Sequence, residues 1–244
     1  MIKVIVIGNA PTLLLNSFGK EIDSYDTIIR LNDFEIEGWE QYVGTRTTIH
    51  ARATNYEYKQ RSVKDFDEIW LKSGWRKHKQ YRLNAPYDDM QSSNIEIMTN
   101  VKHMCSAVRI GDKDTFRSKS IGFVAIETAI SKYYSEGNPI HILGFNLLNV
   151  KENRNIIVDR PHYYKNEPPN VHETHRKTIG LFNHDYILER SIIKEWIKDG
   201  KVHTLFADEI FNDDLDLSHL EPCVRVTPSH LIGKVNPATN KKYK

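Results

Sequence analysis

The chain has 244 residues, of which 39% are hydrophobic and 27% are charged. This length and balance predict a soluble globular protein with a substantial core. The formal net charge of +2 is too small to indicate a nucleic-acid-binding protein, although it leaves anionic small molecules open as ligands. The two cysteines, Cys105 and Cys223, form no zinc or disulfide pattern, which favours a reducing compartment.

The hydrophobic pattern alternates between predicted strands and predicted helices, which indicates an α/β protein. We expect a single-domain, doubly wound, mostly parallel sheet flanked by helices in residues 1–212, followed by an irregular, basic C-terminal tail in residues 213–244. No apolar run approaches the about 20 residues of a membrane span, so we expect a cytoplasmic protein, with peripheral membrane contact left open. The strands are expected at residues 3–8, 26–32, 47–53, 67–73, 94–98, 139–145 and 201–206, and the main helices at residues 11–17, 120–134 and 183–199.

The carboxyl ends of three predicted strands indicate a binding crevice. Ligands of open α/β sheets bind outside these ends, so Gly8–Asn9, Leu31–Asn32 and Gly144–Phe145 should lie near one another. Asn9 offers a hydrogen-bond donor and an acceptor, as a nucleotide base or ribose requires. The stretch "IGNAPTLL" is neither a GxGxxG fingerprint nor a Walker loop, and a tight strand-to-helix turn is the alternative interpretation.

The helix predicted from residue 120 has a second candidate anion site at its start. Its first backbone N–H groups lack partners and lie at the positive end of the helix dipole, where an anion is stabilised. Ser120 would add a hydroxyl, and Gly122 would let a ligand approach closely. The alternative is that Ser120 is an ordinary N-cap.

A long polar segment, residues 146–182, has the length of a lid or binding loop. Its stretch "RPHYYKNEPP" combines His162, Tyr163 and Tyr164 with two cations, a set that suits a phosphate or carboxylate. A solvated loop whose aromatic rings cover the core is the alternative. No convincing metal site is present, because "HETH" lacks the HExxH spacing and the DxD-spaced pair at residues 112 and 114 fits surface charges.

The helix predicted at residues 183–199 carries two polar residues that its apolar stripe does not explain. Glu189 falls within the stripe, and we interpret it as an inward strut that fixes the helix and the loop against it. The alternative is an ordinary buried carboxylate bonded to a neighbouring hydroxyl or backbone amide. His184 lies in the first turn, where the helix dipole disfavours the imidazolium and keeps the ring neutral. A neutral imidazole near physiological pH can take a proton from an attacking hydroxyl.

Taken together and in this order, these stretches resemble the sialylmotifs of the sialyltransferases, glycosyltransferase family twenty-nine. Residues 4–50 are similar to the large motif, with the string "G.EID..D...R.N" and the ending "VGT.TT.H". Residues 120–145 are similar to the small motif, "HYY" to the third motif, and "HDYILE" to the very small motif with its HxxxxE form. The four motifs span most of the chain, and the long first motif is the most specific of them.

The resemblance implies an inverting, metal-independent transferase of Rossmann-like, variant GT-A type, with residues 1–212 as the catalytic domain. Its donor would be CMP-sialic acid, a substrate rather than a cofactor, and its acceptor a hydroxyl of a glycan or glycolipid. His184 would be the general base, with His162 near the phosphate and Glu189 structural. The residues implied in donor binding are Gly8, Asn9, Asn32, Ser120, Gly122, Gly144, Phe145, Tyr163 and Tyr164.

Several positions depart from the family pattern. Thr12, Ile121 and Lys165 replace residues common in the family, while Val4 and Gly137 occupy the positions of the family's disulfide. The missing disulfide and anchor suggest a bacterial or viral type. Two alternatives stay open: a transferase that uses another CMP-activated sugar acid such as CMP-Kdo, and a non-catalytic nucleotide-binding subunit.

Overall fold

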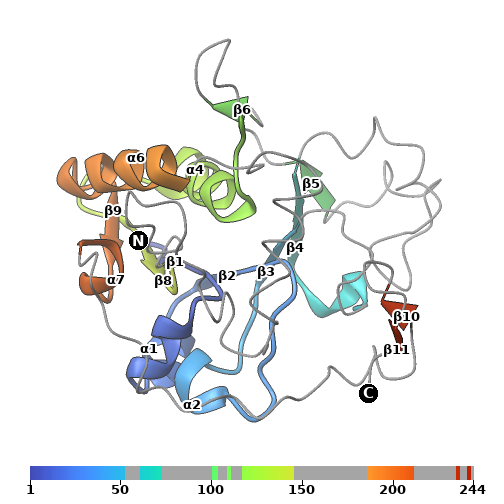
Figure 1. Cartoon of the computed structure of the whole chain (residues 1–244). Helices are drawn as coiled ribbons and strands as arrows, with labels where there is room; N and C mark the ends of the chain where they lie inside the picture. Colours follow the sequence, from blue (N-terminus) through green and yellow to red (C-terminus); the bar gives the residue numbers. More distant parts are fainter. Residues whose placement is uncertain are drawn as a thin grey trace.

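A parallel β-sheet with helices on both faces organises the chain (Figure 1). The computed structural model describes residues 1–52, 61–72, 101–103, 109–110, 117–145, 186–211, 235–236 and 241–242. The sheet has seven strands in the order β5-β4-β3-β2-β1-β8-β9, and every neighbouring pair is parallel. The strands are β1 (Val4–Ile7), β2 (Thr27–Leu31), β3 (Ile49–Arg52), β4 (Glu68–Leu71), β5 (Val101–His103), β8 (Ile140–Leu143) and β9 (Val202–Thr204).

The helices form the two outer layers (Figure 1). The long helices α4 (Ile121–Tyr133) and α6 (Tyr186–Lys198) lie on one face of the sheet, and the short helices α1 (Gly19–Asp23) and α2 (Glu40–Val43) lie on the other. The remaining elements are short: the 3-10 helices η1 (Pro11–Leu15) and η2 (Val63–Asp65), helix α7 (Asp208–Phe211), and the antiparallel pairs β6 (Arg109–Ile110) with β7 (Arg117–Ser118) and β10 (Val235–Asn236) with β11 (Lys241–Lys242).

Strand β1 holds the two halves of the core together, because alternate side chains of a strand point to opposite faces. Val4 and Val6 enter the apolar cluster beneath α4 and α6, while Ile5 and Ile7 enter the cluster beneath α1 and α2. All four side chains are buried, so this strand is apolar throughout rather than alternating. The continuous apolar run in the sequence therefore reflects a strand covered on both faces.

The connections place a topological switch point at β1. From β1 the chain proceeds outward through β2, β3 and β4 to β5, and it later returns to β8 on the other side of β1. In doubly wound sheets, ligands bind at the carboxyl ends of the strands where the order reverses in this way. This topology predicts a binding site at the carboxyl ends of β1 and β8.

The predicted fold class, a doubly wound parallel α/β sheet, is confirmed. The strand expected at residues 94–98 lies outside the described residues, and β5 follows it at the edge of the sheet. The pair β10–β11 lies within the tail that the sequence analysis expects to be irregular. Within the described part of the chain, no helix has both the length and the apolar character needed to cross a membrane.

Candidate functional site

Three glycines and one aromatic ring pack tightly where the switch point meets the start of α4. A Cβ on Gly8 would lie 2.0 Å from the carbonyl oxygen of Gly144, and a Cβ on Gly122 would lie 2.7 Å from the ring of Phe145. Gly144 has a φ of +77°, a left-handed conformation that favours glycine. The turn after β8 therefore occupies the position that a Cβ on Gly8 or Gly122 would take, and this close packing explains why both residues are glycine.

Asn9 ties the end of β1 to the end of β2. Its side-chain Nδ2 donates hydrogen bonds to the carbonyl oxygens of Leu31, at 3.0 Å, and Asp33, at 2.9 Å. Both donor hydrogens of the amide are thus used within the protein, and the side-chain oxygen is the acceptor it can offer elsewhere. Asn9 is partly exposed, so its side chain is accessible at the carboxyl edge of the sheet.

Asn32 has a left-handed backbone, with a φ of +50°, directly after β2. Asparagine adopts this conformation more readily than most residues. The backbone N–H of Asn32 donates to the carbonyl of Ala51 at 2.8 Å, and Nε2 of His50 donates to the carbonyl of Asn32 at 2.6 Å. The neighbouring strand β3 therefore fixes both backbone groups of this strained residue.

His50 is buried, with 1% of its surface exposed, and contacts the rings of Phe34 and Phe66. Burial lowers the pKa of His50 well below its usual value, and the nearby charge of Arg52 lowers it further. Because a carbonyl can only accept, the bond to Asn32 requires a hydrogen on Nε2. His50 is thus a neutral structural residue at neutral pH.

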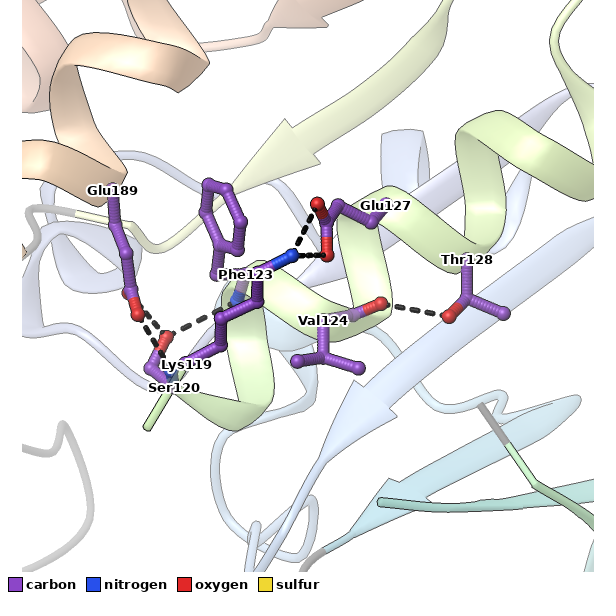
Figure 2. A network of polar contacts seen from close by, with 7 residues as sticks. All are labelled: Lys119, Ser120, Phe123, Val124, Glu127, Thr128 and Glu189. Carbon is purple, nitrogen blue, oxygen red and sulfur yellow. Dashed lines mark hydrogen bonds and ion pairs between the residues drawn. The ribbon is translucent and has the colours of Figure 1, made fainter. Parts of the chain in front are cut away.

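A carboxylate from α6 binds the residue that caps α4 (Figure 2). The Ser120 backbone N–H donates to Oε1 of Glu189, and the Ser120 hydroxyl donates to Oε2, both at 2.6 Å. The same hydroxyl oxygen accepts the backbone N–H of Phe123 at 3.2 Å, which makes Ser120 the N-cap of α4. Glu189 is 0% exposed, and its carboxylate charge lies at the positive end of the α4 dipole.

Two lysines beside the start of α4, Lys72 and Lys119, were not among the residues predicted for the site. Lys72 directly follows β4, and its Nζ donates to the carbonyl oxygen of Lys119. The side chain of Lys119 binds both carboxylate oxygens of Glu127, at 2.7 Å, and lies over the ring of Phe123 (Figure 2). Polar residues that directly follow an apolar strand, as in "DEIWLKS", are the sequence signal that could have identified Lys72.

The structure describes some of the residues that the sequence predicts for the site and leaves others outside the described part of the chain. The structure brings Gly8, Asn9, Asn32, Ser120, Gly122, Gly144, Phe145 and Glu189 to the carboxyl edge of the sheet and the first turn of α4. The predicted residues His162, Tyr163, Tyr164 and His184 lie outside the described residues. Among the residues that the structure does describe, no group of three or more His, Cys, Asp or Glu side chains could hold a metal ion.

Comparison with known proteins shows which family shares this pattern. The sequence profile of glycosyltransferase family 29 (sialyltransferase) matches residues 1–201 of the chain. This segment runs from β1 through α6, so it contains both sides of the contact between Ser120 and Glu189.

Individual curated relatives match over shorter segments. Sialyltransferase-like protein 2 of Arabidopsis thaliana is 51% identical over 43 residues, which are 18% of this chain and 10% of that protein. CMP-N-acetylneuraminate-beta-1,4-galactoside alpha-2,3-sialyltransferase of Mus musculus is 30% identical over 74 residues, 30% of this chain and 20% of that protein. Type 2 lactosamine alpha-2,3-sialyltransferase of Homo sapiens is 48% identical over 46 residues, 19% of this chain and 14% of that protein. The matches thus span a small part of each relative.

A solved structure has the same fold. A mammalian sialyltransferase in complex with Gal-beta-1-3GalNAc-ortho-nitrophenol matches with a TM-score of 0.52 and 15% sequence identity. The match covers 84% of this chain and 69% of that chain. At this level of identity, the likeness establishes the architecture of the sheet and its helices.

The neutral state of buried His50 predicts a loss of stability at acidic pH. Because the pKa of His50 is lower in the folded protein than in the unfolded chain, the unfolded chain binds more protons as the pH falls below about 6.5. The free energy of unfolding should then decrease by at most about 1.4 kcal/mol per pH unit for this residue. Urea unfolding at pH 7.5, 6.5 and 5.5 would measure the decrease.

The variant His50→Gln should show a shallower decrease than the wild type over the same pH range. Burial and His203 also lower the pKa of His141, so His141→Gln should remove a separate contribution of the same sign. Equal pH dependence in His50→Gln and the wild type would contradict the assignment.

The contact between Glu189 and Ser120 predicts energetic coupling between two helices. Glu189→Ala should lower the free energy of unfolding by about 1–3 kcal/mol, because it leaves a backbone N–H and a hydroxyl without their acceptor. Ser120→Ala should cost about 1–2 kcal/mol, and the double variant should cost less than the sum of the two by at least about 0.5 kcal/mol. Urea unfolding measures all three variants.

Thr128→Ala provides the matched control for this cycle. Thr128 also lies on α4, and its hydroxyl donates to the carbonyl of Val124 at 2.8 Å, away from Glu189 (Figure 2). The costs of Glu189→Ala and Thr128→Ala should add to within about 0.5 kcal/mol. Additive costs in the Ser120 cycle as well would show that the contact does not couple the helices.

Proposed function

The chain belongs to glycosyltransferase family 29, the sialyltransferases, and we propose that it transfers sialic acid from CMP-sialic acid to a hydroxyl group of a glycan acceptor. The observation that carries the proposal is the family match over residues 1–201, which includes the switch point of the sheet and the joined ends of α4 and α6. The names of the relatives specify galactosides and lactosamine, so we propose galactose-terminated glycans as the first acceptors to test.

The donor would occupy the carboxyl edge of the sheet. Asn9 offers its side-chain oxygen there, while Asn32 is held in a fixed backbone conformation. The N–H groups of Ile121 and Gly122 lie in the first turn of α4, where the helix itself supplies no acceptor. These amides suit an anionic group of the donor better than the Ser120 hydroxyl does, because that hydroxyl already binds Glu189 and Phe123.

The chemistry would be an inverting displacement. His184 precedes the first residue of α6 by two positions, and Glu189 holds that helix against the cap of α4. As general base, His184 would remove the proton of the acceptor hydroxyl, whose oxygen then forms a bond to the anomeric carbon of the donor. The bond from that carbon to the phosphate oxygen breaks, and CMP leaves with the electron pair.

The leaving group carries a single phosphate, so stabilising it requires less charge than a sugar diphosphate would. His162 with Tyr163 or Tyr164 would supply hydrogen bonds to this phosphate, and the helix N-terminus would add a favourable dipole. We therefore propose that the transfer needs no metal ion.

A donor panel tests the proposed function. The purified protein should release CMP from CMP-sialic acid when lactose or another galactose-terminated glycan is present, and EDTA should leave the rate unchanged. Release would be measured in parallel with CMP-Kdo. Turnover with CMP-Kdo alone would identify a different sugar acid as donor, and CMP binding without turnover of either donor would indicate a non-catalytic nucleotide-binding subunit.

The variant His184→Ala tests the proposed base. It should lower kcat by about 10²–10⁴-fold while the affinity for CMP, measured by calorimetry, stays within about threefold of the wild type. His203→Ala is the matched control, since His203 is exposed on β9 and should leave kcat unchanged. Full activity in His184→Ala would exclude this residue as the base.

A further inference from the structure

Lys72 and Glu189 bind opposite sides of one peptide bond. The carbonyl of Lys119 accepts a hydrogen bond from Nζ of Lys72, and the N–H of Ser120 donates to Glu189. These two backbone groups belong to the same planar unit and point in opposite directions across a trans peptide. The two charged side chains therefore fix the plane of the last peptide before α4.

The charges of the two side chains are suited to this arrangement. A cation faces the partly negative carbonyl oxygen, and an anion faces the partly positive N–H, so both bonds are charge-assisted. Burial lowers the pKa of Lys72, while the carboxylate of Glu189 acts in the opposite direction and favours the ammonium form. Lys72 and Glu189 thus stabilise each other through the peptide that they share.

The side chain of Lys119 restricts the same segment further. Its ammonium group binds Glu127, which lies nearly two turns along α4, and the same group lies over the ring of Phe123, 5.3 Å from the centroid. The segment Lys119–Ser120 is consequently attached to β4 through Lys72, to α6 through Glu189, and to α4 itself through Glu127. Within the described structure, this segment is the point where these three elements are joined by polar contacts.

We propose that Lys72 is a positioning residue for the donor site. By holding the carbonyl of Lys119, it sets the direction of the first turn of α4 and hence of the Ile121 and Gly122 N–H groups. Lys72 acts on the donor through the backbone, so its loss should weaken donor binding more than it slows the chemical step. The inference rests on the proposed function for the identity of its ligand. The clamp, by which we mean the two hydrogen bonds that Lys72 and Glu189 make to the Lys119–Ser120 peptide, can be tested without a ligand.

The experiment compares Lys72→Met with Lys132→Met. Met keeps the length of the side chain and removes the charge and the hydrogen-bond donor in both variants. Lys132 is the matched control, because it also links α4 to β4, through Glu68 at 2.6 Å, but it lies in the last turn of the helix. Lys72→Arg serves as the conservative variant that retains a cation.

The first measurement is amide hydrogen exchange in the protein without ligand. Lys72→Met should increase exchange at the hydrogen-bonded amides of this segment, Ser120, Phe123 and Val124, by about tenfold or more relative to amides in the middle of α4, in line with the loss of one charge-assisted bond. Lys132→Met should leave these three amides unchanged, and Lys72→Arg should restore at least part of their protection.

The second measurement is the donor KM and kcat with CMP-sialic acid. Lys72→Met should raise the donor KM by about tenfold and leave kcat within about threefold, since a factor of ten corresponds to about 1.4 kcal/mol. Unchanged exchange at Ser120, or increased exchange with an unchanged donor KM, would overturn the proposal. If Lys72→Met does not fold, amide exchange and the donor KM are compared between Lys72→Arg and the wild type instead. Smaller changes of the same sign are then expected, and their absence would overturn the proposal.

These outcomes separate the inference from the proposed function. A wild type that turns over no CMP-sugar would contradict the proposed function, while the exchange measurement would still test the clamp. In that case the affinity for CMP, measured by calorimetry, replaces the donor KM. Equal CMP affinity in the wild type and Lys72→Met would overturn the role of Lys72 in ligand binding.

Discussion

The candidate site depends on the hydrogen bonds between the buried carboxylate of Glu189 and Ser120. A carboxylate with no exposed surface requires compensation, and Ser120 provides it with one backbone and one side-chain donor. The dipole of α4 adds to this stabilisation, because the charge lies at its N-terminus. The result is that α6, which follows His184 in the chain, cannot shift without disturbing the first turn of α4.

The fold was largely predictable because the sheet is covered on both faces. Strands such as β1 must then be apolar at every position, and this produces continuous hydrophobic runs that stand out in the sequence. The helix α4 was predictable for a different reason, since Ser120 and the apolar residues after it combine a cap with a buried stripe. Strand β5 gave no comparable signal: it has three residues, "VKH", at the edge of the sheet.

The site was predictable in its location and less so in its contacts. The residues that end strands were identified because parallel strands have their carboxyl ends at one edge of the sheet, but the partners of these residues depend on side chains from distant elements. Gly122 illustrates the limit: a missing Cβ indicates close approach, and sequence alone does not distinguish a ligand from the ring of Phe145. Lys72 illustrates a second limit, because its hydrogen bond to Lys119 joins the end of β4 to the start of α4, two segments that are far apart in the sequence.

Several polar side chains at the carboxyl edge of the sheet bind the backbone of the protein. Glu189, Lys72 and His50 use their charges and donors on the backbone of the protein, at Ser120, Lys119 and Asn32 respectively. Each of them thereby fixes the conformation of a backbone segment at the carboxyl edge of the sheet. In the proposed transferase, such a site would hold its donor with oriented amides rather than with mobile charged side chains, and little reorganisation would then be needed when a charged leaving group forms. Fixed backbone groups of this kind would stabilise a departing phosphate in the proposed reaction without first having to reorient.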